Sequence, residues 1–221
     1  MADRFTIDVV SDVICPWCFL GKRRLDAALA ALDMDVFIRW RPYMLDPAIP
    51  PEGLDRHEYM LNKFGAERLK TIHDPLIEAG RELDVPYHFD LITRTPNTLD
   101  AHRLIRWAHT VDRQTEMVER QTEMVERLFM AYWSEGKDVG DRDSLAACAG
   151  EVGINAAQIR ELLDTPQDVE ETKAEIQHAT NIGVTGVPTF IMAQSYALVG
   201  AQSPAVLVDA ISRVAKEMDE A

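Results

Sequence analysis

Two of the three cysteines in the chain, Cys15 and Cys18, stand in the tetrapeptide Cys-Pro-Trp-Cys. Two thiols at this spacing can form a reversible disulfide or contribute ligands to a metal. A structural zinc ion usually needs four ligands, but the third cysteine, Cys148, stands alone and no two histidines have zinc-site spacing. Pro16 suits the first turn of a helix. The motif therefore favours redox chemistry, and we expect no metal site.

The position of the motif predicts different roles for its two thiols. A buried strand over residues 5–10 precedes it, and apolar residues at helical spacing follow it to about residue 33. Cys15 then lies at the N-terminus of a helix, where unpaired N–H groups and the helix dipole favour a thiolate. We expect Cys15 to be the exposed nucleophile, and Cys18, one turn later, to be the resolving thiol. Cys148 lies on an apolar helical face, which indicates a buried structural thiol.

The segment Gly183-Val-Thr-Gly-Val-Pro-Thr-Phe is the second candidate for a functional site. A proline that enters a strand is disfavoured unless an edge or a turn requires it. A cis bond between Val187 and Pro188 would turn the Val187 backbone outward, where its N–H and C=O could pair with an extended ligand. The segment alone does not decide the isomer, and trans is the commoner one.

Around these segments, the sequence predicts a βαβ unit at the start and a ββα unit at the end. The first unit has its second strand at residues 34–40, which Pro42 stops. The second unit has strands at 189–192 and 196–199, and then a helix capped by Ser203. Residues 43–182 between them are predicted to be helical, over about 55–64, 66–82, 97–111, 112–135, 142–152, 155–164 and 166–182.

A direct repeat stands inside this helical block. Arg113-Gln-Thr-Glu-Met-Val-Glu is followed at once by a second copy that begins at Arg120. Seven residues fall about 20° short of two helical turns, so Met117 and Met124 would share one face. The repeat therefore predicts one continuous helix, lengthened by roughly 10 Å.

Length and charge limit the function classes. The 221 residues suggest one domain with a large insertion. A formal net charge of −14 argues against nucleic acid or an anionic membrane surface as the partner. No apolar run approaches the roughly 18–20 residues that span a bilayer, and the first residues do not resemble a signal peptide. We expect a cytoplasmic protein.

Taken together, these segments resemble the DsbA family, whose thioredoxin fold carries an inserted helical domain. The resemblance is strongest to its FrnE-like branch, which is related to 2-hydroxychromene-2-carboxylate isomerases and kappa-class glutathione transferases. It rests on five segments that span nearly the whole chain: Ser11-Asp-Val-Ile-Cys-Pro-Trp-Cys-Phe-Leu-Gly, Arg41-Pro-Tyr-Met-Leu, Pro96-Asn-Thr-Leu-Asp-Ala-His-Arg-Leu, Gly183-Val-Thr-Gly-Val-Pro-Thr-Phe and Gly200-Ala-Gln.

The resemblance implies an α/β, thioredoxin-like fold with a large all-helical insertion. The thioredoxin-like domain would comprise residues 1–42 and 183–221, and the inserted domain residues 43–182. It also implies a cis Val187–Pro188 bond beside Cys15 and Cys18, and a substrate cleft between the two parts. The predicted substrate-binding residues are Pro16, Trp17, Val187, Pro188, Asn97 and His102.

The implied activity is thiol–disulfide exchange on a protein or a small molecule, without a tightly bound cofactor. The isomerase and transferase branches usually have serine at the place of Cys15 and bind glutathione there. Because both cysteines are present here, the dithiol reaction is favoured, with glutathione as a candidate co-substrate. A glutathione-dependent isomerase or transferase acting on an aromatic small molecule is the alternative. Some FrnE-like proteins carry a second cysteine pair near the C-terminus, and this sequence does not.

Overall fold

The computed structural model describes residues 5–115 and 120–220. Its main sheet has the strand order β2-β1-β5-β6, built from β1 (Phe5–Ser11), β2 (Val36–Pro42), β5 (Thr189–Met192) and β6 (Tyr196–Val199). β1 is parallel to β2 and antiparallel to β5, and β5 and β6 form the predicted hairpin. The βαβ and ββα units of the sequence therefore meet at β1 in the middle of one sheet.

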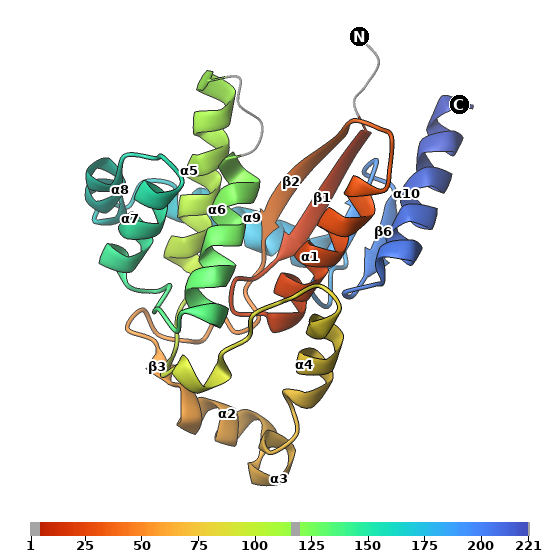
Figure 1. The fold of residues 1–221 in the computed structure, drawn as a ribbon. Helices are drawn as coiled ribbons and strands as arrows, with labels where there is room; N and C mark the ends of the chain where they lie inside the picture. Colours follow the sequence, from red (N-terminus) through yellow and green to blue (C-terminus); the bar gives the residue numbers. More distant parts are fainter. Residues whose placement is uncertain (1–4, 116–119, 221) are drawn as a thin grey trace.

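Helices cover both faces of this sheet (Figure 1). α1 (Pro16–Ala30) and α10 (Pro204–Asp219) pack together over Ile7 and Val9 of β1. Val10 faces the other way and packs against Ala179 of α9 (Val169–Asn181). The period of two along β1 thus separates the two apolar layers. As predicted, the Ser203 side chain caps α10 by accepting a hydrogen bond from Val206 N–H.

The segment between β2 and β5 is mostly helical, as expected. In addition to α9 it contains α2 (Arg56–Phe64), α3 (Ala66–Leu69), α4 (Asp74–Arg81), α5 (Leu99–Thr115), α6 (Arg120–Phe129), α7 (Arg142–Glu151), α8 (Ala156–Leu163), a 3-10 turn η1 (Phe89–Leu91) and a π-helical turn η2 (Met130–Ser134). Two short strands that the sequence analysis did not predict, β3 (Leu54–Asp55) and β4 (Arg94–Thr95), pair with each other. The predicted helix over 66–82 is divided between α3 and α4. None of the described helices is long and apolar enough to cross a membrane.

The prediction of one continuous helix through the repeat is wrong. α5 and α6 lie side by side and run in opposite directions, and the last turns of α5 project beyond the start of α6 (Figure 1). The junction, residues 116–119, lies outside the described residues. Folding back allows α6 to bury Met124, Val125, Leu128 and Phe129. A heptad pattern specifies this apolar face but not whether the preceding helix continues into it.

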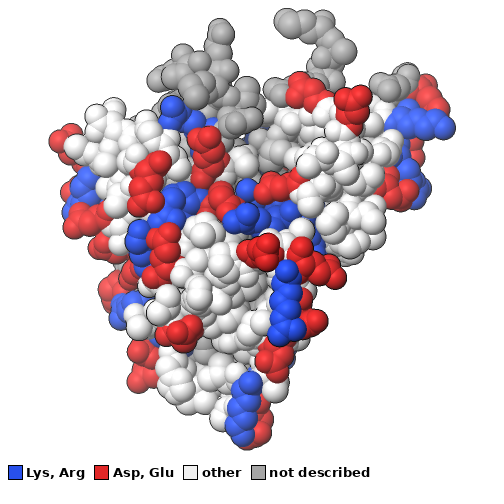
Figure 2. Space-filling model, in the orientation of Figure 1, with Lys and Arg blue, Asp and Glu red and all other residues white. Residues whose placement is uncertain are grey.

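α6 also joins the helical block to the sheet. At the β2 edge, the Gln121 amide accepts a hydrogen bond from Trp40 N–H at 3.0 Å and lies 3.5 Å from Trp40 O. Its Nε2 is also 3.5 Å from Ile105 O in α5. At α1, buried Lys22 pairs with Glu126 at 2.9 Å. Basic side chains form a band across α6 and α1 on the face shown in Figure 2.

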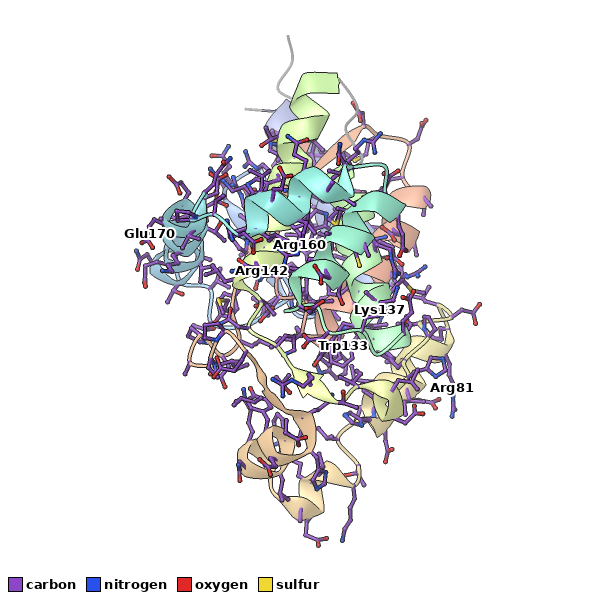
Figure 3. All side chains as sticks on the ribbon, turned by 90° about the vertical axis from the view of Figure 1, so that its left-hand side faces the viewer. Arg81, Trp133, Lys137, Arg142, Arg160 and Glu170 are labelled. Atoms are coloured by element: carbon purple, nitrogen blue, oxygen red, sulfur yellow. The ribbon has the colours of Figure 1, made fainter. Side chains whose placement is uncertain are left out.

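Beyond α6, ion pairs at the surface meet at Asp164, the C-cap residue of α8. Arg142 and Arg160, labelled in Figure 3, both bind Asp164, at 2.9 and 2.5 Å. All three side chains are substantially exposed, so solvent screens these pairs and they add little to stability. The buried polar contacts that connect the helices to the sheet are instead those of α6 with β2, through Gln121, and of α6 with α1, through Lys22.

Candidate thiol site

The chain between β1 and α1 places Cys15 directly before the first turn of the helix. Cys15 N–H donates to Asp12 O at 3.0 Å, which closes a tight turn at the end of β1. Cys15 is the N-cap residue of α1, with extended dihedral angles, and Pro16 takes the first helical position. Its sulfur forms no capping hydrogen bond with the helix. The thiol therefore stands at the positive end of the helix dipole, as the sequence predicted.

The Val187–Pro188 peptide bond is cis, which confirms the prediction. Cys15 Sγ lies 3.6 Å from Val187 O, although the two residues are 172 positions apart in the chain. Pro188 O accepts a hydrogen bond from Gly200 N–H, so the loop is anchored to the residue that follows β6. Among the described residues, none accepts a hydrogen bond from Val187 N–H.

Gly21 allows this loop to approach α1 closely. A Cβ atom at Gly21 would lie 2.8 Å from Pro188 Cγ and 3.5 Å from the ring of Phe190. Only glycine leaves room for the proline ring against the second turn of the helix. Gly21 ends the segment Ser11–Gly21, whose sequence alone indicates no role for it. Gly21 matters for the site because Pro188, which is distant in the sequence, packs directly against it.

The expectation that Cys15 is exposed is wrong. Its side chain is 3% exposed and that of Cys18 is 1% exposed, and both are free thiols. The Cys15 sulfur is turned towards Val187, and both cysteines belong to the main apolar core. Trp17 between them is 39% exposed. At the surface the motif therefore presents an indole beside a thiol that is almost covered.

Burial has a strong effect on Cys18. It raises the pKa of the Cys18 thiol well above the usual range, and the adjacent Cys15 sulfur raises it further. Ser11 at the end of β1 opposes this rise through a hydrogen bond. Cys18 therefore stays protonated at neutral pH. Burial also raises the pKa of Cys148, which is buried in α7 as predicted.

Tyr87 is the main participant that the sequence analysis missed. Its hydroxyl donates a hydrogen bond to Pro16 O at 2.6 Å, inside the Cys-Pro-Trp-Cys motif. Its ring stacks on Phe89 at 5.1 Å and meets the edges of Phe19 at 5.7 Å and Trp133 at 6.1 Å. Trp133, labelled in Figure 3, is itself fixed by a hydrogen bond to Val13 O. Tyr87 lies in irregular backbone just before η1, where no local pattern marks it as part of a site.

Asn97 and His102 do not reach the thiols. Asn97 binds Ile49 O at 2.6 Å and accepts a hydrogen bond from Leu99 N–H, so it fixes a loop to the start of α5. His102 is 4% exposed, and its Nε2 lies 2.9 Å from Tyr43 O and 3.5 Å from the Asp12 carboxylate. Since Cys15 N–H binds Asp12 O, His102 lies behind the motif rather than in contact with it.

The cavities between the sheet and the helices do not open onto Cys15. One, of about 220 Å³, lies between β2, α5, α6 and α9, and is lined partly by Pro42 and His102. Another, of about 620 Å³, lies between α9 and the β5–β6 hairpin. Neither is lined by Cys15 or Pro188. Neither of these two cavities therefore supplies the cleft expected beside the sulfur of Cys15, and that cleft stays a prediction.

A family model for the DSBA-like thioredoxin domain matches residues 6–212. YwbO from Bacillus subtilis (strain 168) is 29% identical over 207 residues, which are 93% of this chain and 95% of that protein. The structure of SCO1869 from Streptomyces coelicolor, named a probable DsbA oxidoreductase, is 25% identical. Its TM-score is 0.86, with 97% of this chain and 91% of that chain covered.

Two further solved structures share the fold at 17% identity. A 2-hydroxychromene-2-carboxylate isomerase has a TM-score of 0.68, with 97% of this chain and 98% of that chain covered. The cytosolic disulfide reductase DsbM from Pseudomonas aeruginosa, solved with GSH, has a TM-score of 0.63, with coverage of 98% and 100%. The fold is therefore thioredoxin-like with a helical insertion, as the sequence predicted, and the chain belongs to the DSBA-like thioredoxin family.

Proposed function

We propose that the protein is a thiol–disulfide oxidoreductase in which Cys15 is the nucleophile and Cys18 the resolving thiol. The observation that carries the proposal is the position of Cys15: at the N-terminus of α1, one helical turn from Cys18 and 3.6 Å from Val187 O. A helix N-terminus stabilises a thiolate, and the neighbouring thiol can complete the exchange.

The reaction begins when the Cys15 thiolate attacks one sulfur of a substrate disulfide. The substrate S–S bond breaks, a mixed disulfide forms, and the leaving thiolate takes up a proton. Cys18 then loses its proton and attacks Cys15, which releases the second substrate thiol and leaves the Cys15–Cys18 disulfide. The substrate disulfide is reduced and the protein dithiol oxidised by two electrons, and the reverse sequence oxidises a substrate dithiol.

The substrate approaches from the side of Val187 and Trp17 in this proposal. The free N–H of Val187, and its C=O once the Cys15 thiol has lost its proton, can pair with an extended segment on one side of the sulfur. The exposed indole of Trp17 offers an apolar contact on the other side. Since Cys15 is nearly covered, attack needs a small outward movement of this loop or of Trp17.

Glutathione is the co-substrate that we propose, and the cytoplasm is the proposed location. DsbM supports both, since it is a cytosolic disulfide reductase whose structure was solved with GSH. The fold shared with the isomerase keeps a second function open, in which glutathione bound at this site assists the conversion of an aromatic small molecule. The two cysteines at the helix start favour exchange over this alternative.

Two assays on the same preparations separate these functions. The first measures reduction of insulin disulfides with reduced glutathione as electron donor, and the second measures glutathione conjugation to an aromatic electrophile. Cys15→Ser should abolish insulin reduction, while Cys148→Ser should leave it unchanged. Conjugation or isomerisation that survives in Cys15→Ser, without insulin reduction by the unmodified protein, would overturn the proposal in favour of the second function.

A further inference from the structure

Tyr87 reaches the thiol motif from the helical insertion. It stands in the connection between α4 and η1, and its hydroxyl donates to the carbonyl of Pro16, the first residue of α1. The aromatic rings of Phe19, Phe89 and Trp133 contact three sides of the Tyr87 ring. A Cβ at Gly80 in α4 would lie 3.2 Å from the same ring. The insertion therefore holds this phenol in one place.

The hydroxyl lies close enough to Cys15 to be affected by its charge. Burial is the largest influence that raises the pKa of Tyr87, and negative charge on Cys15 is the next. The phenol therefore keeps its proton when Cys15 is a thiolate, and remains a hydrogen-bond donor towards the first turn of α1. The backbone N–H groups of this first turn point towards the N-cap position, which Cys15 occupies.

We propose that Tyr87 is a positioning residue that stabilises the Cys15 thiolate by fixing the first turn of α1 through the Pro16 carbonyl. When Cys15 ionises, its proton passes to solvent and Tyr87 keeps its own. The inference deepens the proposed function, because it names the residue through which the insertion controls the nucleophile. The sequence could not suggest it, since Tyr87 is 71 residues from Pro16.

Other ionisable groups surround Cys15 and would remain unchanged in a test. Cys18 and Arg24 lie on α1, where Arg24 influences Tyr87. Asp12 stands at the end of β1 and His102 on α5, 3.5 Å from its carboxylate. The loop over residues 183–188 contributes no ionisable side chain. A change that removes only the Tyr87 hydroxyl therefore isolates its effect.

The test is the rate of iodoacetamide alkylation of Cys15 as a function of pH, followed by mass spectrometry on the reduced full-length protein. Tyr87→Phe keeps the ring and its packing. Alkylation of Cys15 in this variant should be about 2- to 10-fold slower at pH 6, the change expected from the loss of one hydrogen bond, and the two rates should converge at high pH. Tyr132→Phe is the matched control, because Tyr132 also packs edge-to-face against Trp133 and its hydroxyl donates to Arg94 O rather than to Pro16 O. Its profile should match that of the unmodified protein.

An unchanged alkylation profile in Tyr87→Phe would overturn the inference. An equal shift in Tyr132→Phe would overturn it too, because the effect would then not depend on the hydrogen bond to Pro16 O. Thermal melting identifies variants that have lost the fold. Failure of the proposed function looks different. In that case the unmodified protein reduces no insulin, whereas the alkylation profile is measured without any disulfide substrate.

Discussion

At the scale of single residues, the surroundings of the two motif sulfurs predict which one carries the substrate. Cys15 faces Val187 O, whereas Cys18 is buried one turn deeper and has a raised pKa. Cys18→Ser removes the thiol that releases the substrate. We therefore expect this variant to accumulate a mixed disulfide through Cys15, which non-reducing electrophoresis and peptide mass spectrometry would detect.

Cys148→Ser in the Cys18→Ser background provides the control, since Cys148 is buried in α7 and should contribute nothing. A mixed disulfide mapped to Cys148, or none at all after exposure to oxidised insulin, would contradict the assignment.

Gly21 gives a second prediction at this scale. The methyl group of Gly21→Ala would lie 2.8 Å from Pro188 Cγ and must displace the loop that faces Cys15. Such overpacking typically costs about 1–3 kcal/mol, so the melting temperature should fall. Disulfide exchange should slow as well, because Val187 O moves away from the sulfur. Gly186→Ala is the matched control in the same loop, where an added Cβ has nothing within 4 Å. Equal behaviour of the two variants would argue against the close contact.

The sequence predicted which residues of the candidate site come together better than it predicted their surroundings. Cys15 and Val187 come together beside a cis Pro188 as the resemblance to the DsbA family implied, whereas the Gly183–Phe190 segment alone left the isomer open. The burial of Cys15 and the role of Tyr87 were not predictable. Both depend on where the connection between α4 and η1 packs, and no local pattern in the sequence encodes that position.

At the scale of elements, the repeat shows that hydrophobic periodicity predicts a helical face but not where one helix ends and the next begins. The β5–β6 hairpin and the Ser203 cap were predicted at the observed residues, because turns and caps leave local signals. The helix predicted over 112–135 instead divides into α5 and α6, which lie side by side. The heptad spacing specifies an apolar face that includes Met124, but it carries no signal of where a helix ends.

The hairpin of α5 and α6 predicts that one copy of the repeat is dispensable. Among the residues whose burial the structure describes, those buried in α5 reach Ala108 and those buried in α6 begin at Gln121. Deleting residues 113–119 leaves five residues, 109–112 and 120, to connect these buried parts, which is enough for a helix–helix turn. The melting temperature and the alkylation rate of Cys15 should stay close to those of the full chain. Deleting 123–129 instead removes Met124 and Phe129 from the core and should unfold the protein. A large loss of stability on deleting 113–119 would contradict this reading.

At the scale of the whole molecule, a buried carboxylate beside the β2 edge should make stability depend on pH. Burial opposes ionisation of Asp8 most strongly, but hydrogen bonds and charges from Arg39 and Arg41 together outweigh it and lower its pKa. A lowered pKa stabilises the fold above the unfolded value, near 3.9, and this contribution is lost as pH falls through the folded value. Arg127 similarly lowers the pKa of Glu135 to about 2. The melting temperature should therefore fall below about pH 4.

Asp8→Asn tests this dependence. The variant should be about 2–3 kcal/mol less stable than the unmodified protein at pH 7, because charged hydrogen bonds to two arginines are lost. The difference should shrink as the pH approaches 2.5. Asp33→Asn, at an exposed position, should follow the unmodified protein throughout. A constant difference between Asp8→Asn and the unmodified protein at every pH would show that Asp8 does not titrate with folding.

The arrangement of the two parts of the chain stays a proposal: residues 1–42 and 183–221 as the thioredoxin-like domain, and 43–182 as the insertion. α9 falls within the second range, yet it packs on the sheet and covers Val10. α9 therefore packs against the sheet as well as against α5 of the proposed insertion.

The contact between Cys15 and Val187 joins residues 172 positions apart, and it has a consequence for biosynthesis. At about 5–20 residues per second, a ribosome that has added Cys15 needs roughly 10–35 s to reach Val187. During that interval the nascent chain carries both motif thiols without the loop that faces them, and for part of it without Tyr87. The thiols are made first and the loop that faces them much later, so the candidate site is assembled only after Val187 and Pro188 have been added.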